Sequence, residues 1–487
     1  MEKASNKFAV WIALGRIISM LVIFCMPLVM TRFLSQADYG VFSQYFTLYS
    51  SLNVILALGI HANLFYFYPT AEGYEKDRYV TNTLVMLLGM SFIAFVLMSL
   101  PITRDLVFAS SELRRYAGYV TVSIVLTIPM NMVSPLFTVR EDKLAAVTFP
   151  GLIASLRVCT VVLAALISND LRTIFQSLVI FQACVMLGII CYAMHQCRFL
   201  VDFTKMKKQL AYSIPFGMTV GLQLFSNYFD KIASIRFLDS AEYAIYGVAF
   251  MSIPGISQIY DSLCQVNMVN MTRSYQRGSM SGVVSLYKDF VIKTLSFSTP
   301  IILAVSLYSE EIIGLLYPAS YAAAAKFFRI YSLTFLIGML GAGTILRSIN
   351  KTRHSFLSFL IACMIGLPIA YYLISRYGIN GAIIGAVINI VLPRITQICF
   401  EVHDTGVPLF SYLPWKQMGM IFLIALIGLI PMLIIKGFLH PGLLWCIFMS
   451  GIYVLGAYHF YVRNDIFTVD RAFIMKYVNR IVKKKKA

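Results

Sequence analysis

Charge is scarce in this chain, and this scarcity excludes an ordinary soluble protein. Asp, Glu, Lys and Arg make up 13% of the 487 residues and apolar residues 59%, whereas soluble proteins average about a quarter charged and about half apolar. Almost no long stretch lacks an apolar run that could cross a bilayer. Only helices and closed barrels satisfy their backbone groups in lipid, and barrel strands would be short and alternating. The sequence therefore predicts an all-α integral membrane protein.

Motifs for catalysis and metal binding are also missing. The six histidines show no metal-binding spacing, and the nine cysteines include no CxxC pair. No HExxH, GxSxG, Walker or nucleotide-binding glycine pattern occurs in a suitable context. Most cysteines lie inside apolar runs, where buried, unpaired thiols are expected. We therefore predict that the protein is not an enzyme and that it holds no metal or cofactor.

The apolar runs predict roughly fourteen transmembrane helices. These runs cover residues 8–31, 41–67, 80–101, 117–138, 147–168, 174–194, 211–235, 243–266, 290–316, 322–346, 356–375, 380–400, 417–437 and 441–462. Basic residues outnumber acidic ones, 40 to 22. If the N-terminus is cytoplasmic, most Lys and Arg fall on the cytoplasmic side, so both termini are predicted there. The net charge of +18 is then mostly a matter of topology, and no nucleic acid partner is implied.

Two segments of the chain repeat each other. Residues 32–42 read RFLSQADYGVF and residues 236–246 read RFLDSAEYAIY, with Arg, Phe, Leu, Ala and Tyr in register. A weaker echo, LISND at Leu166 and LISRY at Leu373, has nearly the same spacing. The chain is therefore predicted to be a duplicated unit whose second copy begins near Gln209.

This duplication predicts the domain organisation. Residues 1–200 and 209–404 would form two six-helix bundles, and residues 414–462 would add two transmembrane helices. Residues 463–487 are predicted to form a basic amphipathic tail on the anionic inner leaflet. The alternative is a solvated basic tail that only fixes topology.

Each repeated segment carries an acid, Asp38 or Glu242, where the following helix would begin. An acid at this point caps free backbone amides and complements the helix dipole. We therefore interpret both acids as structural.

Charged residues inside the predicted spans are the candidate functional residues. An ionised side chain at the bilayer centre costs about 2.5 to 3.5 kcal/mol on insertion scales, so each needs a partner, a cavity or a function. The basic candidates are Arg16, Arg157, Lys231, Lys293 and Arg394, and the acidic ones are Asp230 and Asp261. The excess of basic groups favours an anionic substrate.

The positions of these charges separate them further. Lys293 and Arg394 lie near span ends and could reach the interface. Asp230 and Lys231 are adjacent and point about 100° apart on a helix, so they cannot pair well with each other. Asp261 is a candidate partner for Lys231, and Asp230 and Asp261 are candidates for ion coupling or structural pairing.

Several longer motifs resemble one known family. They are RFLSQADYGVFSQYFTLYSSL after the first span, YSIPF and FDKI in the second half, LYPASYAAAAKFFRIYSL followed by LRSINKT, and GINGAIIGAVI at 378–388. Together they resemble the polysaccharide-export branch of the MOP superfamily, the Wzx-type flippases of lipid-linked oligosaccharides. The resemblance implies two pseudo-symmetric six-helix bundles around a cavity that opens alternately to each side. Arg16 and Arg157 are the best positional matches for its basic cavity residues.

The resemblance also implies a function in the bacterial inner membrane. The substrate would be an undecaprenyl-pyrophosphate-linked repeat unit, flipped to the outer leaflet for O-antigen (lipopolysaccharide), capsule or exopolysaccharide synthesis. Arg157, Lys231, Lys293 and Arg16 would bind the pyrophosphate. The expected partners are this substrate, membrane lipids and a polysaccharide polymerase. Because such a substrate carries negative charge outward, the membrane potential is expected to contribute to the driving force, and coupling to H⁺ or Na⁺ is left open.

Three other functions are weighed against this one. A MATE-type cation-coupled multidrug exporter would present acids to its substrate, and the first span contains none. A membrane glycosyltransferase or ligase would need a large extracytoplasmic loop and a catalytic acid. A non-transporting membrane assembly partner is compatible with charged residues in a cavity.

Overall fold

The protein was examined as a computed structural model that describes residues 19–253, 255–439, 442–464 and 466. All regular secondary structure in these ranges is helical, which confirms the predicted all-α class. Within the described residues, eight helices are long and apolar enough to cross a membrane. The number is nine if the bent pair Gln36–Leu56 and Ile60–Phe67 counts as one span. The predicted span 8–31 lies partly outside the described residues, and the other predicted spans correspond to helices that are shorter, broken or more polar.

The helices of the described residues are, in chain order, Ser19–Phe33, α2 (Gln36–Leu56), η1 (Ile60–Asn63), α3 (Leu64–Phe67), α4 (Tyr74–Ser99), α5 (Pro101–Val107), α6 (Ser111–Arg114), α7 (Ala117–Thr127), η2 (Pro129–Met132), α8 (Val133–Val139), α9 (Lys143–Ile167), α10 (Leu171–Gln196), α11 (Phe203–Phe237), α12 (Ser240–Ala249), α13 (Ile256–Gln276), α14 (Met280–Leu307), α15 (Ser309–Leu316), η3 (Ala319–Tyr321), α16 (Ala324–Gly338), α17 (Thr344–Ser348), α18 (Thr352–Thr405), α19 (Leu409–Tyr412), α20 (Trp415–Leu439) and α21 (Leu443–Arg463).

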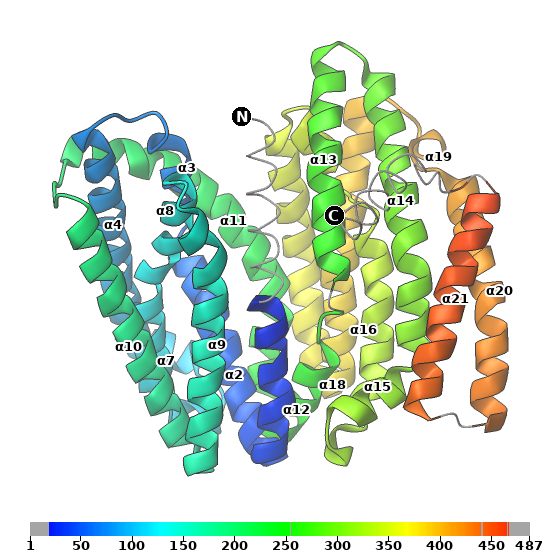
Figure 1. Cartoon of the computed structure of the whole chain (residues 1–487), viewed down its shortest axis with the longest axis horizontal. Coiled ribbons are helices and arrows are strands. Elements are labelled where there is room, and N and C mark those ends of the chain that lie inside the picture. The colour runs from blue at the N-terminus through cyan, green and yellow to red at the C-terminus, as the bar shows by residue number, and fades with distance from the viewer. Residues whose placement is uncertain (1–18, 254, 440–441, 465, 467–487) are drawn as a thin grey trace, which may run out of the picture. The chain divides into compact units, whose positions relative to one another are not determined.

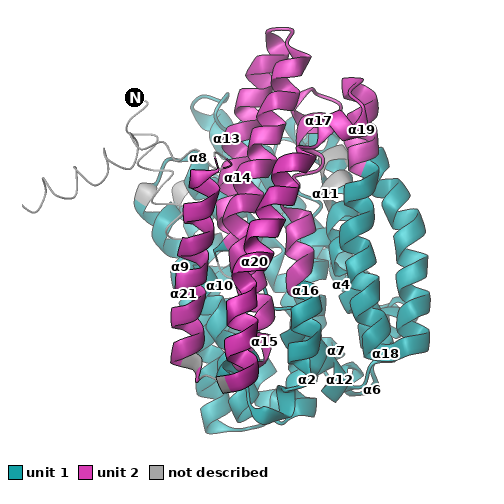
Figure 2. Cartoon of the chain, turned by 90° about the vertical axis from the view of Figure 1, so that its right-hand side faces the viewer, with its two compact units in different colours: residues 1–255, 313–331, 356–396 teal, residues 256–312, 332–355, 397–487 magenta. Residues whose placement is uncertain are grey.

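The chain forms two compact units, coloured separately in Figure 2. Unit 1 contains residues 1–255, 313–331 and 356–396. Unit 2 contains residues 256–312, 332–355 and 397–487. The predicted division into bundles at 1–200 and 209–404 follows sequence order and stays a prediction. The predicted amphipathic tail lies almost wholly outside the described residues.

Unit 1 is organised around α2. This helix packs on α7, α11 and α12, while α9 and α10 run side by side (Figure 1). Tyr45 and Leu48 of α2 are completely buried, and the Tyr45 ring stacks on Phe175 of α10 with ring centroids 4.2 Å apart. Burial of large side chains on one helix face provides the apolar area that holds such a bundle together.

The repeated segments begin α2 and α12, and their caps correct the sequence interpretation. The N-cap of α2 is Ser35, whose Oγ accepts a hydrogen bond from the Asp38 amide at 3.1 Å. The N-cap of α12 is Asp239, whose Oδ1 accepts from the Glu242 amide at 2.7 Å. Asp38 and Glu242 therefore stand in the first turn and do not themselves cap the helices. They still complement the helix dipole from there.

The predicted span at 243–266 is not one helix. The helix α12 ends at Ala249 and α13 begins at Ile256. Gly255, just before α13, has a φ of +89°, which a residue with a side chain rarely adopts. The break separates ten residues of unit 1 from a polar helix of unit 2.

Two other predicted spans are joined in one element. Residues 356–375 and 380–400 both lie in α18, which turns at Gly378, where φ is 54° and ψ is −130°. His354 near the start of α18 hydrogen-bonds Asp404 near its end, with Nδ1 and Oδ2 2.5 Å apart. Gly378 therefore forms the turn of a helical hairpin whose two ends meet.

Unit 2 contains a fully buried acid that holds a helix start. Glu401 is 0% exposed, and its Oε1 accepts hydrogen bonds from the amides of Gly343 and Ile345, each at 2.9 Å. Its Oε2 accepts from the Tyr412 hydroxyl at 2.7 Å. Because both carboxylate oxygens are satisfied, this residue is explained as a cap for α17.

Candidate functional site

Unit 1 contains a cavity of about 380 Å³ with two basic side chains in its lining. We call it the cation cavity. Its wall is formed by Ser19–Phe33, α2, α9 and α11, and the basic residues are Arg157 from α9 and Lys231 from α11. The structure thus brings together two of the four cations predicted to bind substrate.

Arg157 is the cation of this cavity with the clearest unmet bonding capacity. Its Nε is buried and has no hydrogen-bond partner among the described residues. A buried guanidinium nitrogen without a partner is costly, because its lost hydration is not replaced. The side chain therefore favours an anionic or acceptor-rich ligand at this position.

Lys231 adds a second positive charge. Its Nζ lies 5.4 Å from the centroid of the Tyr228 ring, one turn earlier on α11, a distance at which the ring face attracts a cation. Within the described residues, neither Lys231 nor Arg157 forms an ion pair with a carboxylate. The lining of the cation cavity therefore carries two basic side chains and no carboxylate.

Hydroxyl groups line another side of the cation cavity. Ser43, Thr47 and Ser50 of α2 all line it, and their spacing places them on one helix face. The Thr47 hydroxyl accepts a hydrogen bond from the Tyr243 hydroxyl at 3.0 Å. These groups give the cavity neutral hydrogen-bonding capacity beside its charges.

A second cavity of unit 1, about 300 Å³ in volume, adjoins the first. We call it the Asp230 cavity. Tyr228 and Lys231 line both cavities, which shows that the two are neighbours. Asp230 is 4% exposed and accepts a hydrogen bond from the Tyr246 hydroxyl at 2.5 Å. Asn389 also lines this cavity, and its buried Nδ2 has no partner among the described residues.

The remaining predicted site residues lie elsewhere. Arg16 is outside the described residues. Lys293 of α14 and Asp261 of α13 are exposed residues of unit 2. Lys231 belongs to unit 1, so its proposed pairing with Asp261 stays a prediction. A role of any of these residues in substrate binding also stays a prediction.

Several lining residues were not predicted from the sequence. Ser43, Thr47 and Tyr228 belong to the cation cavity, and Asn389 to the Asp230 cavity. The hydroxyl row of α2 has a readable signal, because its members recur at helical spacing in an apolar run. Asn389 carries no comparable signal, since its place depends on the α18 hairpin.

The sequence of the chain matches one family of known proteins. The model of the family described as "Polysaccharide biosynthesis protein" matches residues 6–267. Among curated proteins, no sequence relative was found.

Solved structures share the fold. The lipid II flippase MurJ, in an inward closed conformation, aligns with a TM-score of 0.72 and 14% identity over 94% of this chain and 100% of its own. An inward-facing multidrug resistance MATE transporter of the MOP superfamily aligns with a TM-score of 0.61 and 12% identity, over 81% and 98%. A MOP transporter from Pyrococcus furiosus aligns with a TM-score of 0.54 and 13% identity, over 82% and 96%.

These matches agree with the resemblance seen in the sequence motifs. At 12 to 14% identity, the structural matches establish the fold alone. The family model covers more than half of the chain. The chain is therefore a multi-pass membrane protein that shares the fold of these transporters, and it belongs to the polysaccharide biosynthesis protein family.

Proposed function

We propose that the protein is a flippase that moves a lipid-linked oligosaccharide from the cytoplasmic to the outer leaflet by alternating access. The observation that carries this proposal is the cation cavity, in which Arg157 and Lys231 share one space without a carboxylate partner among the described residues. In a polysaccharide biosynthesis protein, an anionic group on a glycan carrier is the ligand that matches this charge.

A pyrophosphate joined to undecaprenol is the anion we propose. Arg presents forked donors that suit phosphate oxygens, and Lys adds a compact point charge. The hydroxyls of Ser43, Thr47 and Ser50 can bond the first sugar, while the prenyl tail stays in lipid. The repeat unit would serve O-antigen, capsule or exopolysaccharide synthesis, and a polysaccharide polymerase would receive it.

The driving force follows from charge and orientation. In the proposed orientation, the protein lies in a bacterial inner membrane with both termini in the cytoplasm. The substrate then carries negative charge outward when it is flipped. An inside-negative potential assists this movement by about 2.3 kcal/mol per charge per 100 mV. We therefore propose that the membrane potential contributes to transport.

Ion coupling at Asp230 is a second element of the proposal. The Asp230 cavity holds a nearly buried carboxylate and the amide of Asn389 beside Lys231. A carboxylate can take up a proton, and carboxylate and amide oxygens together can coordinate Na⁺. Asp261, an exposed residue of unit 2, is the other candidate for this role.

The same carboxylate favours a second candidate function, a MATE-type exporter of cationic drugs. The fold is shared with such exporters, so only cavity chemistry separates the two. A cationic drug would be repelled by Arg157 and Lys231. A non-transporting assembly partner would need neither cavity.

The test is a flipping assay in proteoliposomes with an undecaprenyl-pyrophosphate-linked oligosaccharide. Arg157→Gln and Lys231→Gln are each expected to slow flipping about 10- to 100-fold, because a charged hydrogen bond contributes about 1.5 to 3 kcal/mol. Lys326→Gln, which changes an exposed lysine of unit 1, is the matched control. Unchanged flipping in both cavity variants would overturn the binding assignment. Transport of a cationic drug, without flipping of the lipid-linked oligosaccharide, would favour the MATE-type function.

A further inference from the structure

The segment that joins α10 to α11 has properties that transport does not explain. We call residues 197–208 the strap. It leads into α11, which has 35 residues and is thus about 52 Å long at 1.5 Å per residue. A transmembrane helix needs only about 20 residues. The helix α11 is therefore longer than a span requires. Its first turns, which belong to the strap, can lie outside the apolar layer of the membrane.

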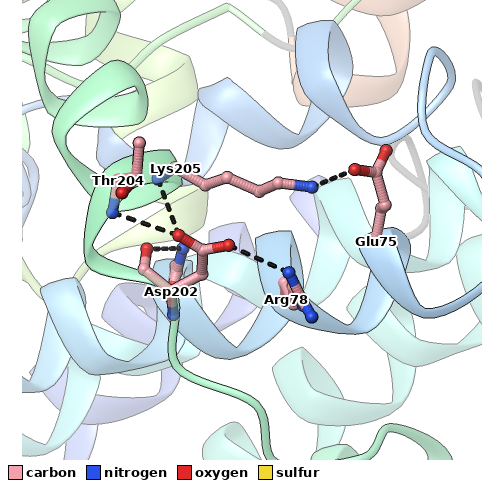
Figure 3. A network of polar contacts seen from close by, with 6 residues as sticks. Glu75, Arg78, Asp202, Thr204 and Lys205 are labelled. Carbon is pink, nitrogen blue, oxygen red and sulfur yellow. Dashed lines mark hydrogen bonds and ion pairs between the residues drawn. The ribbon is translucent and has the colours of Figure 1, made fainter.

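Polar contacts on one side fix the strap to α4 (Figure 3). Asp202 caps α11 by accepting hydrogen bonds from the amides of Thr204 and Lys205, each at 3.1 Å. Its Oδ2 also pairs with Arg78 Nη1 at 3.1 Å. Lys205 pairs with Glu75. These contacts hold the strap against α4.

The first turns of α11 are polar inside and partly apolar outside. Gln209 and Ser213 are 0% exposed. Gln209 Nε2 donates to Asn63 Oδ1 and Thr83 Oγ1, each at 3.0 Å. Phe203, in the first turn of the same helix, is by contrast 78% exposed. On a helix that faces water, a large apolar side chain is usually buried, so the exposed Phe203 favours an apolar layer beside this turn.

More exposed apolar side chains continue the Phe203 side along the strap. Phe199 is 58% exposed and Val201 40% exposed, and Tyr74 of the neighbouring α4 is 57% exposed. The Arg198 guanidinium lies over the Tyr74 ring, 4.5 Å from its centroid. Aromatic rings beside basic groups are typical of the membrane–water interface.

Basic groups accompany this apolar row. Lys207 and Lys208 are exposed, and within the described residues neither has a hydrogen bond or ion pair. Lys207 follows Phe203 by four residues and therefore shares its side of the helix, whereas Lys208 lies about 100° further round. Exposed apolar groups followed by unpaired lysines match a surface that carries negative charge above an apolar layer.

We propose that the strap is an interfacial anchor that binds the phosphate headgroups of anionic phospholipids. Phe199, Val201 and Phe203 enter the boundary between headgroups and acyl chains, while Arg198, Lys207 and Lys208 contact the phosphates. In the orientation proposed above, this leaflet is the inner one. The anchor itself does not depend on the transport function.

The anchor also bears on the joint between α4 and α11. Asp202 and Lys205, which hold α11 to α4, lie in the same short segment as the lipid-facing side chains. Lipid binding on one side of the strap therefore steadies the polar contacts on the other. An acidic protein is a different partner for the same charges, and the experiment below separates the two.

The first experiment places Phe203→Trp in the full-length chain, reconstituted in nanodiscs with and without brominated acyl chains. The chain has three other Trp residues, so the parent protein provides the reference spectrum. Insertion predicts that bromine quenches the added emission and that aqueous iodide does not. Quenching by iodide alone would place the strap in water and overturn the anchor.

The second experiment measures anionic lipid retained by the protein in mixed phosphatidylcholine and phosphatidylglycerol nanodiscs. Lys207→Gln and Lys208→Gln are each expected to weaken phosphatidylglycerol binding about fivefold, and less so at high salt. Arg277→Gln, an exposed arginine of unit 2, is the control and should change nothing. Equal retention in all variants would overturn the lipid assignment and favour an acidic protein partner.

Discussion

Two contacts within unit 1 join helices of the two sequence halves, and they use opposite chemistry. Where α2 meets α12, the backbones nearly touch, since a Cβ on Gly40 would lie 1.7 Å from the Ser240 carbonyl oxygen. Where α4 meets α11, side chains of opposite charge and amides form the contact, as in the Arg78–Asp202 pair. The first contact depends on shape and the second on polar partners. Water can replace polar partners but not close packing, so the α4–α11 contact is the one we expect to open more easily.

The largest effect is expected at the close-packed contact. Gly40→Ala would force a methyl group into the Ser240 backbone and push α12 away from α2. We expect a loss of about 1 to 3 kcal/mol in the free energy of unfolding, measured by thermal unfolding in detergent. Gly89→Ala is the control, because its Cβ would meet nothing within 4 Å. An equal melting temperature for both variants would contradict the shape-dependent contact.

The next effect is expected at Gln209, the buried centre of the polar contact. Gln209→Ala removes the side-chain amide that donates to Asn63 Oδ1 and Thr83 Oγ1. Each of these buried oxygens then loses one hydrogen bond. We expect a loss of about 1 to 3 kcal/mol, partly relieved if water enters. Gln176→Ala, at an exposed glutamine, is the control and should cost less than about 0.5 kcal/mol. If the two variants lose equal stability, Gln209 is not a central contact.

A smaller effect is expected for the exposed part of the same contact. The Glu75 side chain of the Glu75–Lys205 pair is 54% exposed, so a double-mutant cycle with Glu75→Gln and Lys205→Gln should give a coupling of about 0.2 to 1 kcal/mol. Added salt should reduce this coupling further. A coupling unaffected by salt would mean that the pair is shielded from solvent and that this contact opens less easily than proposed.

The smallest effect is expected from the pH dependence of Asp202. The amide of Lys205, and with it the Arg78 guanidinium, holds the pKa of this carboxyl below its ordinary value of 3.8. The stabilisation is therefore fully present above pH 3.8 and is lost as the pH falls through the lowered pKa. Asp202→Asn should lower the melting temperature slightly at neutral pH, and the difference should shrink in acid. A difference that grows in acid would contradict this sign.

The sequence predicted more of the fold than of its interruptions. Apolar runs fixed the all-α class because each span must satisfy its own backbone in lipid. The break after Ala249 was not predicted, whereas the turn at Gly378 falls in the gap between the predicted spans 356–375 and 380–400. The break after Ala249 lies inside an apolar run, where the composition does not change although the backbone does. The N-caps Ser35 and Asp239 also lie in the repeated segments, three residues before the acids Asp38 and Glu242, which were predicted to cap the helices.

The sequence alone determined that Arg157 and Lys231 needed a partner or a cavity, because a charge in an apolar run is costly wherever it faces. Only the tertiary structure decided that both line one cavity, since they come from helices far apart in the chain. The strap shows the same division between sequence and structure. Its lysines are visible in the sequence as signals of membrane topology. Helix spacing places Lys207 on the Phe203 side, whereas the contacts of α11 with α4 decide that this side is left exposed. Composition and periodicity report the medium around a helix, whereas the meeting of distant side chains is set by packing.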